Sequence, residues 1–179
     1  MKATEHTGGK PVTVIGAGLV GAGWAIVFAR AGLSVRLYDH MPQVSQSAPA
    51  LIAQQLERLH GYGLLNEPVA LIRERIVVMS DLKLALDGAA YAQESVLEKV
   101  DIKRRLFEEI DSFGFDSLII GSSTSGFPAS DFALDLAISP RVLVAHPVNP
   151  PYLVPLVELV GGRQTSPQTI DAAKEFFRY

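Results

Sequence analysis

The sequence predicts an α/β fold: a doubly wound, mostly parallel sheet with helices on both faces. Short apolar runs alternate along the chain with amphipathic segments of helical period. A glycine-rich turn joins the first apolar run to the first helical segment. Polar clusters follow several of the apolar runs, as expected where parallel strands end at a ligand-binding edge. Together these features favour strands and helices in alternation around one sheet.

The predicted strands are residues 11–18, 34–39, 75–81, 90–96, 117–123, 141–146 and 153–160. The predicted helices are residues 19–32, 47–63, 82–89 and 101–114, and helical spacing returns over 166–179. Gly32 closes the first helix, and Pro49 fits the first turn of the second helix.

Composition narrows the function classes. The 179 residues are 48% hydrophobic and 20% charged, with a net charge of −3, so no electrostatic footprint for nucleic acid or an anionic membrane is expected. The absence of cysteine excludes disulfides and cysteine-ligated metal, and the four histidines are scattered without ligand spacing, so no metal site is expected. No apolar run is long enough to span a bilayer. We expect a cytoplasmic protein.

The chain is expected to form one domain over residues 11–179, preceded by a flexible tail over residues 1–10. The final helical segment ends on aromatic residues with no capping signal. We therefore expect the domain to be truncated in its last helix.

The turn Gly16-x-Gly18-x-x-Gly21 directly follows a predicted strand and opens a helix. In a dinucleotide-binding (Rossmann-type) unit, the first glycine permits the tight turn, the second lets the backbone approach a pyrophosphate, and the third allows close packing of helix and strand. The helix N-terminus adds free N–H groups and a positive dipole end. The predicted phosphate-binding residues are Gly16, Ala17, Gly18, Leu19, Val20 and Gly21.

Asp39 ends the second predicted strand, at the spacing expected of the carboxylate that binds a ribose 2′-hydroxyl. No lysine or arginine adjoins it, so a 2′-phosphate would be repelled and the predicted cofactor is NAD rather than NADP. The alternative is a glycine turn that only packs, with Asp39 as a solvated turn residue.

Four polar clusters fall at predicted strand ends: Asp39, residues 94–99 around Glu98, residues 121–126, and residues 146–149. In a doubly wound sheet these ends face one crevice, which predicts an active site there.

Glu158 lies within the apolar run "PLVELV", where an unpaired carboxylate would cost several kcal/mol. His146 is the nearest titratable partner, and a carboxylate bonded to one imidazole nitrogen orients the ring as a base. The alternative is a hydrogen-bonded packing histidine, with Glu158 facing solvent on an edge strand. From the residue pattern alone, both interpretations stay open.

The serine cluster at residues 121–126 suggests a second enzyme class, a Ser-His-Glu hydrolase. It does not fit the G-x-S-x-G nucleophile elbow, and a hydrolase would not explain the dinucleotide loop. A plain serine-rich turn is the remaining alternative.

These motifs together resemble the NAD-binding domain of the 3-hydroxyacyl-CoA dehydrogenase superfamily. The resemblance runs from "VTVIGAGLVGAG" through "ESVLEKVDIKRRLF" and "SSTSG" to "HPVNPPYLVPLVELV". The last stretch is most similar to the L-gulonate 3-dehydrogenase and lambda-crystallin branch, with the L-carnitine dehydrogenases as close competitors.

The resemblance implies a role for each matching residue. It assigns the catalytic base to His146 and its orienting carboxylate to Glu158. Ser125 would contact the substrate oxygen and the cofactor near the nicotinamide, and Asn149 would lie close by. Glu98 and Lys103 would contact NAD.

Two departures shape the predicted function. Acyl-CoA members carry lysines on the helix after the second strand, whereas residues 41–70 here contain no lysine and one arginine, Arg58. We therefore predict NAD-dependent oxidation of a small free 3-hydroxy acid such as L-gulonate. The alternatives are L-carnitine, a short 3-hydroxyacyl-CoA, or a non-enzymatic, crystallin-like NAD-binding role.

The family's helical C-terminal domain, which completes the cleft and forms a homodimer, is missing from these residues, so we expect the chain alone to be inactive.

Overall fold

The computed structural model describes residues 7–178 and shows one seven-stranded sheet, in the order β3-β2-β1-β4-β5-β6-β7. The strands are β1 (Val12–Ile15), β2 (Val35–Tyr38), β3 (Ile76–Met79), β4 (Tyr91–Glu94), β5 (Ile119–Ser122), β6 (Val142–Pro147) and β7 (Val157–Gly161). All neighbours pair in parallel except β6 and β7, which are antiparallel. The predicted doubly wound, mostly parallel sheet is confirmed.

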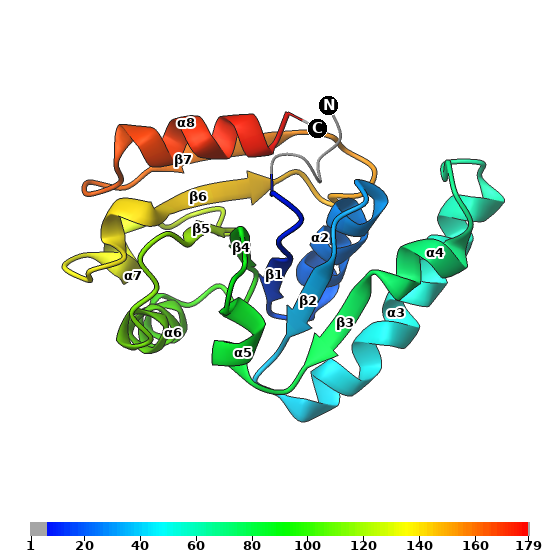
Figure 1. Ribbon diagram of the computed structural model, residues 1–179, viewed down its shortest axis with the longest axis horizontal. Coiled ribbons are helices and arrows are strands. Elements are labelled where there is room, and N and C mark those ends of the chain that lie inside the picture. Colours follow the sequence, from blue (N-terminus) through cyan, green and yellow to red (C-terminus); the bar gives the residue numbers. More distant parts are fainter. Residues whose placement is uncertain (1–6, 179) are drawn as a thin grey trace.

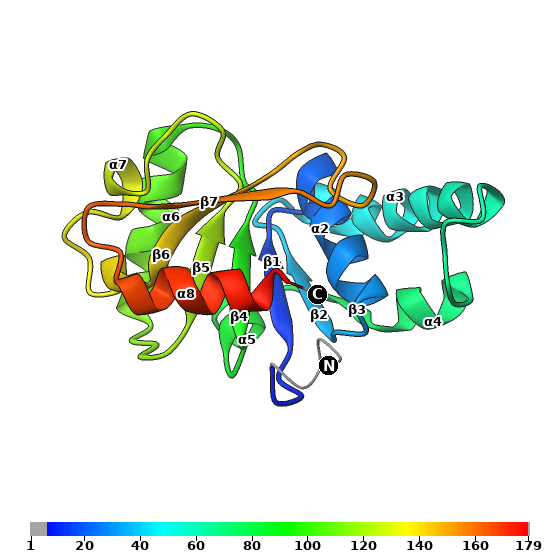
Figure 2. The same ribbon diagram turned by 90° about the horizontal axis from the view of Figure 1, so that it is seen from above.

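Helices cover both faces of this sheet (Figures 1 and 2). They are α2 (Leu19–Arg30), α3 (Pro42–Gly61), α4 (Val69–Glu74), α5 (Leu82–Leu86), α6 (Val100–Ser112), α7 (Ser130–Ala133) and α8 (Pro167–Phe176), with a 3₁₀ turn, η1 (Ser139–Arg141). One buried apolar cluster joins the sheet to α2, α3, α4 and α8. A second cluster joins it to α5, α6 and α7. The core therefore has two layers, one on each side of the strands.

Helix α2 lies against the centre of the sheet because its sequence lets it approach closely. Gly21, Ala22, Ala25 and Ala29 are all buried. Such small side chains allow short distances between backbones, and Trp24 and Phe28 then fill the space beside them with stacked rings 5.2 Å apart.

The N-terminal boundary of α3 differs from the prediction. The helix begins at Pro42 rather than near residue 47, so Pro49 lies inside it and not in its first turn. Pro42 already supplies the preset φ angle that favours a helix start, and its missing N–H costs nothing there. Downstream, Ala48, Ile52, Leu56 and Leu59 form the buried stripe.

Two helices were not predicted, α4 and α7, of 6 and 4 residues. Both are too short for a helical period to emerge from the sequence. Residues 1–6 of the predicted tail lie outside the described residues. Thr7 is buried and its carbonyl accepts the Lys10 N–H, whereas residues 8–10 are exposed.

The strand order reverses between β1 and β4, since the chain builds outward from β1 to β3 and then returns to β4 on the other side. Ligands of doubly wound sheets bind at the carboxyl ends of the strands beside such a reversal. The fold therefore places the site beyond Ile15 and Glu94, which are partners in the β1–β4 register.

Candidate active site and cofactor cleft

The glycine loop has the geometry that its sequence predicts. Gly16 has a φ of +95°, and a Cβ there would lie 2.5 Å from the Ser95 carbonyl oxygen. A Cβ on Gly21 would lie 1.7 Å from the Gly16 carbonyl oxygen, so no larger residue fits. By contrast, a Cβ on Gly18 would meet nothing within 4 Å. The loop is thus packed underneath and open above, as a phosphate cradle requires.

Helix α2 starts directly above this open side. Gly18 is its N-cap and provides no side-chain hydrogen bond, and no other side chain among residues 7–178 caps the N–H groups of the first turn. Leu19, the first helical residue, is 76% exposed. Free N–H groups and the positive end of the helix dipole together favour a bound phosphate.

Asp39 joins the loop to the end of β2. Its Oδ2 accepts the Ala17 N–H at 2.8 Å, and its Oδ1 accepts the Met41 N–H at 2.8 Å. The Ala17 N–H is therefore already occupied by Asp39, a contact that the sequence did not predict. The Asp39 side chain is 11% exposed, so it reaches the surface beside the loop, where a ribose hydroxyl is predicted to bind.

A buried charged cluster follows β4. Glu94 and Lys103 have side chains that are 0% and 1% exposed, and Lys103 Nζ lies 2.8 and 3.0 Å from the two Glu94 carboxylate oxygens. The Ser122 hydroxyl and the Val96 N–H also donate to Glu94. Lys103 Nζ contacts Glu98 as well, at 3.3 Å. Lys103 therefore has little surface left for the predicted contact with NAD.

The sequence placed Glu94 in the polar cluster of residues 94–99 at a strand end, but it did not predict its pairing with Lys103. A usable signal was present, since Glu94 ends that buried strand and Lys103 lies nine residues later on the following helix. A carboxylate at such a position needs a buried cation as its partner.

Glu98 connects this cluster to the loop after β5. Its Oε1 accepts the Thr124 hydroxyl at 2.5 Å and the Ser125 N–H at 3.0 Å. Burial opposes ionisation of Glu98, but the hydrogen bond from Thr124, the charge of Lys103 and the Ser125 N–H outweigh it and lower the pKa of the carboxyl. Ser125 is exposed, and its hydroxyl has no partner among residues 7–178.

His146 and Glu158 face each other across the antiparallel pair β6–β7. His146 Nδ1 lies 2.7 Å from Glu158 Oε2, so the predicted contact is present. The buried setting predicted for Glu158 is wrong, because its side chain is 62% exposed. The reason is topological: β7 is the edge strand, and alternate residues of an edge strand face water.

Asn149 lies in the loop that joins β6 to β7 and is exposed. It lines a cavity of about 460 Å³ together with Leu19 and Val20 of the glycine-loop region and Leu51 and Gln55 of α3. This brings three segments far apart in the sequence to one opening. All residues that line the cavity are uncharged.

The chain matches a known protein family over nearly its whole length. Residues 11–179 match the family described as the 3-hydroxyacyl-CoA dehydrogenase, NAD binding domain. The chain belongs to this family. The resemblance predicted from the sequence is confirmed, and so is NAD as the cofactor of the domain.

Curated relatives support the same family. The chain is 38% identical over 169 residues to the lambda-crystallin homolog of Bos taurus, covering 93% of the chain and 53% of the relative. It is 39% identical over 166 residues to the L-carnitine dehydrogenase of Streptomyces griseus, covering 93% and 49%. This chain of the 3-hydroxyacyl-CoA dehydrogenase family therefore spans about half the length of the curated relatives it matches.

Solved structures agree in fold. A 3-hydroxybutyryl-CoA dehydrogenase from Escherichia coli superimposes with a TM-score of 0.86 at 27% identity, covering 94% of this chain and 36% of that one. An (S)-3-hydroxybutyryl-CoA dehydrogenase from Ralstonia eutropha gives 0.85 at 29% identity, covering 94% and 60%.

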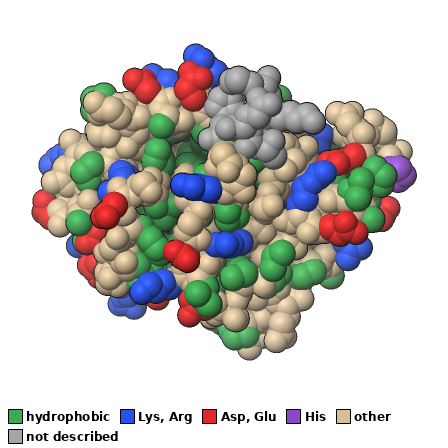
Figure 3. All heavy atoms as spheres, in the orientation of Figure 1, with side chains coloured by type: hydrophobic (Ala, Val, Ile, Leu, Met, Phe, Trp, Pro, Cys, Tyr) green, Lys and Arg blue, Asp and Glu red, His purple; other side chains and the backbone are tan. Residues whose placement is uncertain are grey.

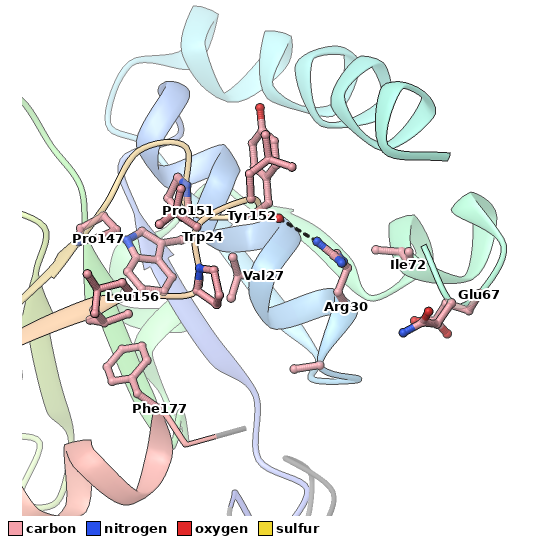
Figure 4. Close-up of a pocket in the computed structure, with 16 residues that line it drawn as sticks. Trp24, Val27, Arg30, Glu67, Ile72, Pro147, Pro151, Tyr152, Leu156 and Phe177 are labelled. Carbon is pink, nitrogen blue, oxygen red and sulfur yellow. Dashed lines mark hydrogen bonds between the residues drawn. The ribbon is translucent and has the colours of Figure 1, made fainter. Parts of the chain in front are cut away.

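None of the predicted site residues of this NAD-binding domain lines a larger cavity of about 640 Å³, although Pro147 and Val157, the chain neighbours of His146 and Glu158, do (Figure 4). Trp24 of α2, Leu156 and Phe177 lie on one side of it, and Arg30 donates to the Tyr152 carbonyl at 2.8 Å on the other.

Within residues 7–178, no helix is long and apolar enough to cross a membrane. In the same part of the chain, no group of three His, Asp or Glu residues has the geometry to hold a metal ion. On the face shown in Figure 3, Lys and Arg side chains are interspersed with Asp and Glu.

Proposed function

We propose that this chain is the NAD-binding part of a dehydrogenase that oxidises the 3-hydroxyl of a small free hydroxy acid such as L-gulonate. In this proposal His146 is the general base, Glu158 orients it, and Ser125 holds the substrate oxygen. The proposal rests on the family and on one observation above all, the contact between His146 Nδ1 and Glu158 Oε2 at 2.7 Å.

That contact defines what the imidazole does. An ionised Glu158 only accepts hydrogen bonds, so Nδ1 carries the hydrogen of the neutral ring and Nε2 is left as the acceptor. Nε2 has no hydrogen-bond partner among the described residues. It is therefore available to take the hydroxyl proton of a substrate, and the adjacent carboxylate stabilises the imidazolium that forms.

NAD, when bound, supplies the nicotinamide ring that accepts the hydride. The residues present fit the dinucleotide, because the open side of Gly18, the uncapped start of α2 and Asp39 lie together at the carboxyl edge of the sheet. The Ser125 hydroxyl can donate to the substrate oxygen, since its backbone is fixed by Glu98 while its side chain has no other partner among the described residues.

The charge around the cleft favours a small substrate over a CoA thioester. Helix α3 carries one arginine, Arg58, and no lysine. The cavity beside it is lined by uncharged residues alone. A CoA chain carries several phosphate charges, and the lining of this cavity offers no cation to pair with them.

L-Carnitine is the second candidate, because a relative named L-carnitine dehydrogenase is as similar to the chain as the lambda-crystallin homolog. A non-enzymatic, crystallin-like NAD-binding role is the alternative from another class. The His146–Glu158 contact argues against it, since binding alone does not require a base.

The deciding experiment measures NADH formation by the longest natural protein that contains this chain. L-Gulonate, L-carnitine and 3-hydroxybutyryl-CoA are compared at equal concentration, with the 179-residue chain alone as a further sample. We expect turnover with a free hydroxy acid, and none from the 179 residues alone. In the active protein, His146→Ala should lower kcat by about 10²- to 10⁴-fold while NADH affinity changes little.

The matched control is His60→Ala, an exposed histidine of α3 far along the chain from the site. It should leave kcat unchanged. Normal turnover by His146→Ala would overturn the assignment of the base. NADH binding without turnover on any of the three substrates would favour the non-enzymatic role.

A further inference from the structure

A chain of hydrogen bonds beneath the cleft has no role in the proposed function so far. It is centred on Ser123, which follows β5 directly. The Ser123 hydroxyl oxygen lies 3.0 Å from Trp24 Nε1, 2.8 Å from Gln93 Nε2 and 2.8 Å from the Ser95 hydroxyl. These contacts connect α2, β4 and β5.

Two of the three bonds have a fixed direction. An indole nitrogen only donates, so Trp24 donates to Ser123. The Gln93 amide nitrogen also lies 3.0 Å from the Ala145 carbonyl oxygen, which only accepts. Its amide therefore places NH₂ toward both Ala145 and Ser123, while the Tyr91 hydroxyl donates to its oxygen at 2.6 Å.

The third direction follows from the other two. A serine hydroxyl has one hydrogen to donate and two positions at which to accept. Both acceptor positions of Ser123 are filled, by Trp24 and Gln93, so its hydrogen must go to Ser95. Ser95 accepts this bond, and its own hydrogen has no acceptor among residues 7–178. The network thus leaves the hydrogen of the Ser95 hydroxyl available to donate to a ligand.

Ser95 lies where this hydroxyl could reach a bound cofactor. Ser95 directly follows β4, and its carbonyl oxygen packs against Gly16 of the phosphate loop. It therefore lies at the reversal of strand order between β1 and β4, where the ligand crevice opens. The residue is only partly buried.

We propose that the Ser95 hydroxyl is a further positioning group, which donates a hydrogen bond to an acceptor oxygen in the nicotinamide half of NAD. This inference rests on the proposed binding of NAD in the cleft. Asp39 follows β2 and is assigned to the adenosine ribose, and the glycine loop follows β1 and is assigned to the pyrophosphate. The remainder of the dinucleotide must then pass over β4, where Ser95 lies.

Calorimetric titration of the 179-residue chain with NADH and with ADP tests this inference. ADP has the adenosine half of the dinucleotide but not the nicotinamide half. Ser95→Ala should raise the Kd for NADH by about 3- to 10-fold, the effect of one neutral hydrogen bond, and leave the Kd for ADP unchanged. Ser112→Ala, an exposed serine at the end of α6, is the matched control and should change neither value.

Trp24→Phe tests the direction of the hydrogen bonds. Without the indole donor, Ser123 gains a free acceptor position and the bond between the two serines can reverse. NADH binding should weaken by at most about twofold. When Ser123 donates to Ser95, which is one of the two possible directions of this bond, the Ser95 hydrogen is still available to the ligand. The double variant Ser95→Ala/Trp24→Phe should bind NADH no more weakly than Ser95→Ala, since Trp24 acts on the ligand through Ser95.

Three results would overturn the inference: normal NADH affinity in Ser95→Ala, equal losses for NADH and ADP, or additive losses in the double variant. Failure of the unchanged chain to bind NADH would overturn the proposed function together with this inference. Unfolding in urea, followed for each variant, separates a lost contact from a loosened fold.

Discussion

Two acid–base pairs lie at the carboxyl ends of the strands, with almost equal distances and opposite surroundings. Lys103 Nζ lies 2.8 Å from Glu94, and His146 Nδ1 lies 2.7 Å from Glu158. The first pair has side chains that are 1% and 0% exposed, and the second pair has side chains that are 26% and 62% exposed. Equal geometry therefore does not give the two pairs equal roles.

The difference follows from the cost of removing charge from water. A buried ion separated from its partner is left uncompensated, whereas an exposed ion is solvated again. The Glu94–Lys103 pair is thus a structural support, which fixes Glu98 and through it the Ser125 loop. The exposed His146–Glu158 pair should contribute little to folding, and in the proposed function it exchanges a proton with the substrate.

The largest effect should come from breaking the buried pair. Glu94→Ala leaves the Lys103 ammonium in the interior with only Glu98 at 3.3 Å, and should lower the free energy of unfolding by about 3–5 kcal/mol. Urea unfolding of the 179-residue chain measures this change. Glu94→Leu/Lys103→Met, which removes both charges, should recover most of the lost stability. A loss below about 1 kcal/mol in Glu94→Ala would show that the pair is not the support proposed here.

The exposure of the Asp39 side chain, 11%, lies between the exposures of the two pairs, and its carboxylate accepts two backbone N–H groups. Asp39→Ala should lower the free energy of unfolding by about 1–3 kcal/mol, because hydrogen bonds to a charged group are lost on a partly solvated residue. It should also weaken the binding of NADH and of ADP alike, raising each Kd by about 10-fold or more, since both ligands contain the adenosine ribose. Calorimetric titration checks this, and an unchanged Kd for ADP would contradict the ribose assignment.

The sequence was sufficient for the features that depend on local geometry. Gly16 and Gly21 leave no room for a Cβ, and such a constraint is visible in the spacing of the glycines themselves. The His146–Glu158 contact was also anticipated, although for a partly wrong reason, because the exposure of Glu158 depends on β7 being an edge strand. Strand order is a property of the assembled sheet and has no local signal.

Features that depend on three-dimensional convergence were missed. Nothing near Asp39 in the sequence indicates that Ala17, 22 residues earlier, occupies one of its carboxylate oxygens. The Glu94 cluster likewise joins β4, α6 and β5 through side chains that are distant along the chain. Periodicity identifies which face of an element is buried, but it does not identify the partner that a buried charge will find there.

Breaking the exposed pair should have a small effect on folding. Glu158→Ala should change the free energy of unfolding by less than about 1 kcal/mol, as expected for a pair in contact with solvent. The same urea unfolding assay applies, with Glu94→Ala as the reference. A loss comparable to that of Glu94→Ala would remove the contrast between the two pairs and make His146–Glu158 a structural contact.

The smallest effect concerns Glu98, which connects the buried cluster to the Ser125 loop. Its folded pKa is lowered from the usual 4.5 despite burial, because of the Thr124 hydrogen bond, the Lys103 charge and the Ser125 N–H. The ionised form therefore stabilises the fold fully above about pH 4.5, and this contribution is lost as the pH falls through the lowered folded pKa. Between pH 6.5 and pH 3.5 the unchanged chain should lose more of its urea resistance than Glu98→Gln does. Glu57→Gln, on an exposed residue of α3, is the control. If Glu98→Gln and the unchanged chain lost stability in parallel, then Glu98 would be solvated like Glu158, and the buried support would end at Lys103 rather than reach the Ser125 loop.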